Sequence, residues 1–359
     1  MKNFMKILFS TAFLLILACG ADMNDPYTGY DDYVDKSDGD YQDRPDSGNI
    51  PGGGSSDEDN VVPVVDNDQE MVEDKDLEVT DTDELEEGVY SQEPTVDSCE
   101  SGSVSDSEKT KVLVWVNYIR SLHDLSPVAY EEDDDIYTAE CSLVIAANKR
   151  LEHFPDSSWD CFTEDALTGC SKSNIYIYSG GNPLSVPSES IINAYMTDIG
   201  VEVLGHRRWL IDPWLAHVSF SRVDDVHNKV LGSAIKVIND EQQDISGSDI
   251  EFVAYPYEYY PKELFNSDVQ MSFTVVEDTT SKWQNDDVDF LTAAIAVTDP
   301  DNKKMTVSGR ASDNEGYGVP NILRWKVDSA QEGVKYNVVI SNVRVNNVPK
   351  TYSYWFELK

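Results

Sequence analysis

The stretch GHRRWLIDP, Gly205 to Pro213, places a titratable side chain inside a run of residues that is otherwise built to be buried. Its His206 is one of only five histidines in the chain. His153 is the second candidate, because it ends a helical pattern of apolar residues. Imidazoles can bind a divalent metal ion or transfer protons near neutral pH, so both residues are candidates for a functional site.

The motifs of several common enzyme classes are missing from the sequence. There is no HExxH, GxSxG, P-loop or GxGxxG pattern. Their absence argues against the common zinc proteases, serine hydrolases and nucleotide-binding proteins. In the opening stretch, we expect His206 and Trp209 or Leu210 to face the interior, while Arg207 and Arg208 point outward and pair with carboxylates.

The N-terminus has the features of an export signal. Lys2 and Lys6 precede a short apolar run, which is too short for a membrane span and typical of a signal peptide, residues 1–18. The tetrapeptide Ile16-Leu17-Ala18-Cys19 resembles the bacterial lipobox, which predicts lipidation of Cys19. The predicted location is therefore the cell envelope, lipid-anchored to a bacterial membrane on its extracytoplasmic side.

A strongly acidic segment follows the signal peptide. Residues 21–100 carry 27 Asp and Glu side chains against three basic ones, a net charge of −24 out of −40 for the 359 residues. A segment this charged and this poor in large apolar residues predicts a disordered, extended tether, residues 19–105. The same charge argues against a nucleic-acid partner.

The remaining residues have the patterns of two globular parts, with predicted domains at 106–261 and 262–359. Apolar residues recur at helical spacing in the first part, and short β-branched runs separated by turn residues dominate the second. Helices are expected over 112–122, 136–151 and 191–196, and strands over 218–222, 230–238, 250–255, 271–276, 293–298, 304–308, 322–327, 336–345 and 352–358.

The order of several short motifs resembles the CAP superfamily of cysteine-rich secretory, antigen and pathogenesis-related proteins, in its bacterial SCP-like form. The matching pieces are Val116-Asn117-Tyr118-Ile119-Arg120, Ala146-Ala147-Asn148 through His153, Ser173-Asn174-Ile175, Tyr195-Met196-Thr197-Asp198, Gly205-His206-Arg207-Arg208-Trp209 and Asp212-Pro213. The resemblance implies an α+β fold: an αβα sandwich CAP domain followed by a small all-β, Ig-like sandwich.

The resemblance also implies an open cleft with two histidines and two acidic residues, which in some members holds a divalent cation. His153 and His206 match the histidines, and Asp198 matches one acid. Ser173 stands where the second acid is expected, with Asn174 kept beside it. Three ligands, His153, His206 and Asp198, could still form a weak metal site for a cation such as zinc, with catalysis or an inherited, non-catalytic cleft as open alternatives.

Four further cysteines, Cys99, Cys141, Cys161 and Cys170, occur in the chain. An even number in an exported chain favours disulfides, and no CxxC spacing supports a metal site. A Cys141–Cys161 bond would hold the loop that carries His153, which leaves Cys99 to pair with Cys170.

The sequence thus predicts a lipid-anchored binding module rather than an enzyme. Its ligand would be a small apolar molecule, a divalent metal ion or a cell-surface partner. The alternative is a metal-assisted hydrolase, a peptidase or esterase, in which a metal held by His153, His206 and Asp198 activates water.

Overall fold

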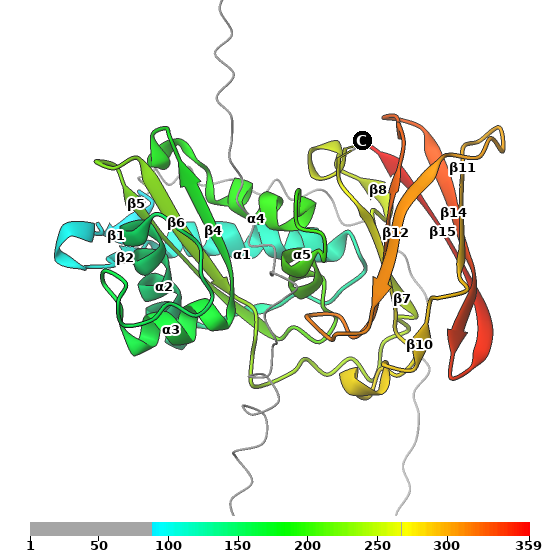
Figure 1. Ribbon diagram of the computed structural model, residues 1–359, viewed down its shortest axis with the longest axis horizontal. Helices are drawn as coiled ribbons and strands as arrows, with labels where there is room; N and C mark the ends of the chain where they lie inside the picture. The colour runs from blue at the N-terminus through cyan, green and yellow to red at the C-terminus, as the bar shows by residue number, and fades with distance from the viewer. Residues whose placement is uncertain (1–87, 267) are drawn as a thin grey trace, which may run out of the picture. The chain divides into compact units, whose positions relative to one another are not determined.

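The computed structural model describes residues 88–266 and 268–359 (Figure 1). The predicted signal peptide, the lipidation site at Cys19 and most of the predicted tether lie outside the described residues. The end of the predicted tether has regular structure, because β1 (Tyr90–Gln92) pairs with β2 (Ser103–Val104). None of the helices in the described ranges has the length and apolar character that a membrane span requires.

The first large sheet has the strand order β3-β5-β6-β4 and is antiparallel except for the parallel β3–β5 pair. The strands are β3 (Ala129–Tyr130), β5 (His217–Asp225), β6 (Val230–Lys236) and β4 (Ser173–Ser179). Every residue of β6 is buried, as expected for a strand that is covered on both faces. Gly232 in β6 lets a helix approach closely, since a Cβ atom there would lie 2.3 Å from the Ser142 carbonyl oxygen.

Five α-helices occur in the described part of the chain: α1 (Asp106–Ser121), α2 (Asp135–Asn148), α3 (Glu164–Ser171), α4 (Ser188–Thr197) and α5 (Gly205–Leu210). The N-cap of α1 is Ser105, whose hydroxyl accepts a hydrogen bond from the Glu108 amide. Val116 and its helical neighbours then bury the apolar side of α1. Helices α2 and α3 pack against the sheet through a separate cluster that includes Ile175 and Ala234.

The C-terminal half forms two further sheets. One contains β10 (Val288–Asp289), β14 (Lys335–Val345), β15 (Val348–Leu358), β8 (Glu258–Tyr260) and β11 (Ala294–Thr298), and the other contains β12 (Val307–Asp313), β13 (Ile322–Val327), β9 (Met271–Val275) and β7 (Phe252–Tyr255). Asn346 and Asn347 join β14 to β15 with φ values of 51° and 63°, a left-handed conformation that asparagine tolerates in a tight hairpin. Aromatic rings connect the two sheets: the Phe273 centroid lies 5.3 Å from that of Tyr352.

The predicted fold class is wrong. The described chain is sheet-rich, with fifteen strands in four sheets against five α-helices, rather than the expected αβα sandwich of the CAP type followed by an Ig-like sandwich. Two of the helices are short, with eight residues in α3 and six in α5. The order of short motifs along the sequence carried no information on how much of the chain pairs into sheets.

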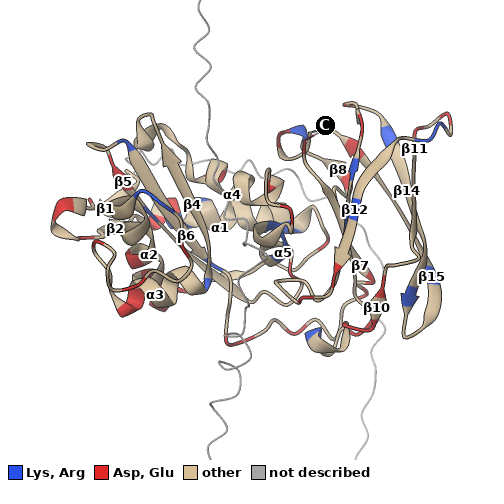
Figure 2. Cartoon of the chain, viewed as in Figure 1, with Lys and Arg blue, Asp and Glu red and all other residues tan. Residues whose placement is uncertain are grey.

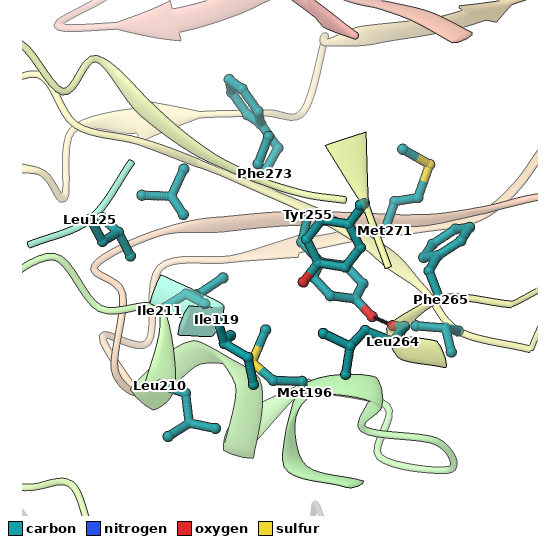
Figure 3. Packing of buried hydrophobic residues seen from close by; sticks show 14 of the residues in the cluster. Ile119, Leu125, Met196, Leu210, Ile211, Tyr255, Leu264, Phe265, Met271 and Phe273 are labelled. Atoms are coloured by element: carbon teal, nitrogen blue, oxygen red, sulfur yellow. Dashed lines mark hydrogen bonds between the residues drawn. The ribbon is translucent and has the colours of Figure 1, made fainter. Parts of the chain in front are cut away.

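A continuous hydrophobic core joins helices α1, α4 and α5 to the strands of the β-rich half. Met196 of α4 and Leu210 of α5 lie in the same buried cluster as Tyr255 of β7, Phe273 of β9 and Leu264, which precedes β9 (Figure 3). The cluster also contains Phe220 of β5 and Leu231 of β6, so strands of both halves contribute to it. The core residues come from the whole described range, from Val112 to Leu358. Burial of this shared surface stabilises the helical and the β-rich halves together.

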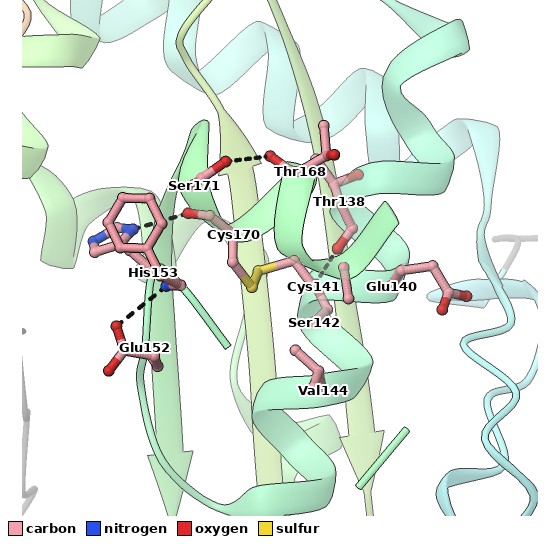
Figure 4. Close-up of a disulfide and its surroundings, with 12 residues drawn as sticks. Thr138, Glu140, Cys141, Ser142, Val144, Glu152, His153, Thr168, Cys170 and Ser171 are labelled. Carbon is pink, nitrogen blue, oxygen red and sulfur yellow. Dashed lines mark hydrogen bonds between the residues drawn. A yellow bond between two sulfur atoms is a disulfide. The ribbon is translucent and has the colours of Figure 1, made fainter. Parts of the chain in front are cut away.

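Two disulfides, Cys99–Cys161 and Cys141–Cys170, confirm that the cysteines pair with each other. The predicted pairing was wrong. Cys141 faces α3 because Gly169 lets α3 approach α2 closely: a Cβ at that glycine would lie 2.0 Å from the Tyr137 carbonyl oxygen. Cys170 on α3 is then the nearest cysteine, as Figure 4 shows. Cys161 instead lies beside Val96, next to Cys99.

His123 is a buried histidine outside the predicted site. Its Nδ1 lies 2.8 Å from the Ala254 carbonyl oxygen and its Nε2 lies 3.1 Å from the Tyr260 hydroxyl. Burial lowers its pKa from 6.5 to about 4, and the charges of Arg207 and Arg120 act in the same direction. The imidazole is therefore neutral in the folded protein, where it joins the end of α1 to β7 and β8.

Stability should fall with acidification because of His123. The unfolded chain binds a proton at this residue below pH 6.5, while the folded chain resists protonation until about pH 4, so the stabilisation present above pH 6.5 is lost as the pH falls through this window. The loss should approach about 3 kcal/mol. Urea unfolding between these pH values should show a flatter pH dependence for His123→Gln. The exposed His227→Gln is the control, and equal slopes for His123→Gln and the unmodified protein would contradict the assignment.

Each disulfide should contribute comparably to stability. Cys141→Ala/Cys170→Ala opens a loop with a sequence separation of 29, and Cys99→Ala/Cys161→Ala opens one of 62. Since the loop-closure entropy grows only with the logarithm of length, each double variant should lose about 4 kcal/mol of unfolding free energy in urea titrations. A peptide map of the unreduced protein should show the two bonds described above. A Cys141–Cys161 peptide in that map would overturn the pairing.

Candidate functional site

Asp198 and His206 form the centre of the candidate site. Asp198 follows α4 in a left-handed conformation, with φ of 51°, and only 3% of it is exposed. Its Oδ1 accepts a hydrogen bond from His206 Nδ1 at 2.8 Å, and its Oδ2 accepts one from the Arg207 amide at 3.2 Å. One carboxylate therefore satisfies a free N–H at the start of α5 and also holds the imidazole that α5 carries.

Two further elements hold His206 in place. The side chain of Asn174, on β4, donates to the His206 carbonyl oxygen at 3.0 Å. The ring of Tyr195, on α4, lies 5.2 Å from the imidazole between centroids, and its hydroxyl donates to the Asn174 carbonyl oxygen at 3.0 Å. Strand β4 and helices α4 and α5 therefore fix both the backbone and the ring of this residue. The sequence did not single out Tyr195 for this role, although it stands in the same short motif as Asp198.

His153 lies in the loop after α2, beside the Cys141–Cys170 disulfide (Figure 4). Its Nδ1 lies 2.8 Å from the Cys170 carbonyl oxygen. Burial lowers the pKa of His153, and the positive charge of a protonated His206 would lower it further. No hydrogen bond joins the two rings in the described residues; what they share is an acceptor at Nδ1.

The hydrogen bonds determine which nitrogen of each ring is protonated. A carbonyl oxygen and a carboxylate can only accept, so each Nδ1 must donate its proton, and the Nε2 of each neutral ring is left with a free lone pair. Neither Nε2 atom has a hydrogen-bond partner among the described residues. This pattern, in which one ring nitrogen is held by an acceptor and the other is free, is the one that metal-binding histidines show.

Asp198 supports His206 rather than standing beside it as a third ligand. Both of its oxygens are engaged, one by the imidazole and one by the Arg207 amide. In the described part of the chain, no three His, Cys, Asp or Glu side chains are grouped closely enough to hold a metal ion. A cation bound by both imidazoles would therefore need its other ligands from outside the protein.

Ser173 does not replace the missing acid. It begins β4, it is 5% exposed, and its hydroxyl is buried without a hydrogen-bond partner in the described residues. It makes no hydrogen bond to His153 or His206. A hydroxyl carries no charge at neutral pH, so this position adds neither an anionic metal ligand nor a general base.

The two arginines of GHRRWLIDP are buried, contrary to the prediction that they point outward. Figure 2 marks the basic residues of α5 in blue. Arg207 donates to three carbonyl oxygens, those of Met196 at 2.6 Å, Thr197 at 3.0 Å and Gln270 at 2.7 Å, and lies 3.7 Å over the Tyr255 ring. Its side chain is thus bound by carbonyl oxygens rather than by a carboxylate. The five N–H donors of the guanidinium group make this connection between α4 and the segment before β9 possible.

Arg208 does pair with a carboxylate, but in the interior. Its NH1 lies 2.8 Å from Asp313 Oδ1 at the end of β12. Gly318 makes room for this approach, since it has φ of 66° and a Cβ there would lie 2.4 Å from the Arg208 carbonyl. A second buried ion pair, Lys282 to Asp212 at 2.7 Å, connects the end of the same stretch to the β-rich half. Two buried ion pairs therefore connect the segment that carries His206 to the β-rich half.

Comparison with known proteins does not assign this chain to a family. No protein-family model matches it, and no curated protein matches it. The resemblance to the CAP superfamily therefore rests on short motifs alone. The candidate site consists of two imidazoles, each held at Nδ1, whose Nε2 atoms have no hydrogen-bond partner among the described residues.

Proposed function

We propose that this protein is an exported binding module whose His153/His206 pair takes a divalent transition-metal ion such as zinc. The observation that carries the proposal is the hydrogen-bonding pattern that the two rings share. His153 is held at Nδ1 by a carbonyl oxygen and His206 by the carboxylate of Asp198, so both Nε2 lone pairs are available. Zinc accepts imidazole nitrogens readily, and two protein ligands leave positions open for water or an external ligand.

The electrostatics of the site favour a cation over an anion. A metal binds only the neutral imidazole, and burial keeps the pKa of His153 low, so this ring is ready to bind at neutral pH. The carboxylate of Asp198 makes the imidazole of His206 a stronger ligand. A site with two protein ligands should bind zinc weakly, which suits a protein that uses the metal to recruit a second molecule.

The disulfides and the predicted N-terminal signals favour a role outside the cytoplasm. The two disulfides are of the kind that form in oxidising compartments. Together with the predicted signal peptide and the predicted lipid at Cys19, they favour a protein that is anchored to a membrane and displays its histidine pair on the extracytoplasmic side. The acidic segment would then separate this site from the membrane surface.

Binding is favoured over hydrolysis by what surrounds the imidazoles. The hydroxyl of Ser173 has no hydrogen bond to either ring, and Cys99, Cys141, Cys161 and Cys170 are all in disulfides. The described residues therefore place no serine or cysteine nucleophile on either histidine. Metal-assisted hydrolysis, the alternative that the sequence left open, would need water activated by the bound ion.

Zinc binding should be visible at two of the five histidines. In imidazole NMR spectra of the full chain, zinc should shift or broaden the signals of His153 and His206, because their Nε2 atoms coordinate the ion, and should leave those of His123, His217 and His227 unchanged. His206→Ala should abolish the effect at His153, since one imidazole cannot hold the ion alone. Asp198→Asn should weaken binding by about tenfold or more.

A site-resolved measurement is needed because the acidic segment will also attract cations. His227→Ala, which removes an exposed imidazole, is the matched control and should leave the affinity unchanged. If zinc shifts the signals of all histidines alike, or leaves those of His153 and His206 untouched, the proposed site is wrong. Zinc-dependent cleavage of a peptide library that disappears in His206→Ala would instead favour the hydrolase.

A further inference from the structure

A hollow of about 510 Å³ opens in the β-rich half of the molecule. Three segments line it: residues 248–251, which lead into β7; residues 276–277, which follow β9; and residues 350–352 of β15. It shares no lining residue with the histidine pair. Its volume lies within the range of small-molecule sites.

Carboxylates dominate the charge of this hollow. Asp249 and Glu251 are exposed, and neither side chain has a hydrogen-bond or ion-pair partner among the described residues. Glu277 pairs with Lys350, which supplies the only basic side chain of the lining. Three carboxylates therefore face one ammonium group, and two of the three are free to bind a cation.

Tyr352 provides a polar group that the fold leaves unused. The residue is only 8% exposed, and its ring packs on Phe273 and Phe252. Its hydroxyl nevertheless has no hydrogen-bond partner among the described residues, and the residue lines the hollow. Burial, with the carboxylates of Glu277 and Glu251, raises the pKa of Tyr352 to about 12. The phenol is thus neutral at pH 7 and sits in a negative field, where it can accept a hydrogen bond from a cationic donor.

We infer that this hollow binds a ligand that carries an alkylammonium group. The N–H donors of such a group match the free carboxylates of Asp249 and Glu251 and the unused hydroxyl of Tyr352. The side chains of Ile250 and Val276 offer apolar surface for the methylene groups beside the nitrogen. A single metal ion fits less well, because no three carboxylates in the described residues lie close enough together to share one.

Lys350 indicates the pose of such a ligand. Its own side chain is an alkylammonium group, and it occupies the carboxylate of Glu277 at the edge of the hollow. A ligand with two ammonium groups can reach Asp249 and Glu251 with one end and compete with Lys350 for Glu277 with the other. A diamine or a lysine-rich peptide carries two such groups, and the chemical group is the same in both.

The test uses the full chain labelled with 3-fluorotyrosine. Among the signals of its 19 tyrosines, that of Tyr352 is identified by its loss in Tyr352→Phe. The probe is 1,4-diaminobutane, and the uncharged 1,4-butanediol is its matched control. The diamine should shift the Tyr352 signal in a saturable manner and the diol should not. Glu251→Gln should weaken the affinity by about tenfold, because it removes one charge-assisted hydrogen bond.

Asp301→Asn is the control variant, since it removes an exposed carboxylate that does not line the hollow and should leave the affinity unchanged. A tetralysine peptide, measured in the same way, shows whether the ammonium group comes from a free amine or from a lysine side chain, according to which binds more tightly. The inference fails if the diamine leaves the Tyr352 signal in place, if the diol shifts it equally, or if Glu251→Gln binds as well as the unmodified protein. Because the readout is at Tyr352, failure here leaves the zinc proposal unaffected.

Discussion

The side chain of Arg207 is the contact on which the arrangement of the site depends. Its guanidinium group donates to Met196 and Thr197 at the end of α4 and to Gln270 just before β9, while Tyr255 covers its face. An arginine with no exposed surface is costly to bury, and it is tolerated here because carbonyl oxygens and an aromatic ring replace water around the charge. The backbone amide of Arg207 donates to Asp198, so Arg207 also holds the carboxylate that orients His206.

The two halves of the molecule are held together by the same residues that border the site. Arg208 binds Asp313, and Asp212 binds Lys282, in both cases across the boundary that the sequence suggested between two domains. Breaking one partner of such a buried pair would leave an unpaired charge in the interior. His206 therefore lies in a rigid segment rather than in a flexible loop, and its ring is oriented before any ligand arrives. His153 is held in a different way, by the carbonyl of a disulfide-bonded cysteine.

The negative charge of the molecule is distributed unevenly, and its carboxylates differ in what they bind. Most of it belongs to the acidic N-terminal segment, which attracts cations without selecting among them. Within the described residues, by contrast, carboxylates have defined tasks. Asp198 orients an imidazole, Asp212 and Asp313 neutralise buried cations, and Asp249 and Glu251 remain free at the rim of a hollow. The position of a carboxylate relative to other groups, more than the net charge, decides what it can bind.

The sequence alone determined those features that depend on neighbours along the chain. The helical spacing around Val116 and the β-branched runs at 230–238, 271–276 and 322–327 correctly located α1, β6, β9 and β13, because periodicity is a local property. The even number of cysteines indicated disulfides. His206 was singled out because it lies in an apolar run, and His153 because it ends a helical pattern of apolar residues. The convergence of those histidines on one site was expected from a resemblance in motif order, and it stays a prediction.

Tertiary structure decided the rest. The cysteine pairing depended on how closely α3 approaches α2, which Gly169 permits. Arg207 and Arg208 were expected on outward faces of the helix, paired with carboxylates, but carbonyl oxygens and Asp313 from distant segments accommodate them in the interior. The number of ligands at the histidine pair and the sheet-rich fold follow from contacts between segments far apart in the chain. No local pattern encodes such contacts, since each residue's surroundings form only when the whole core closes.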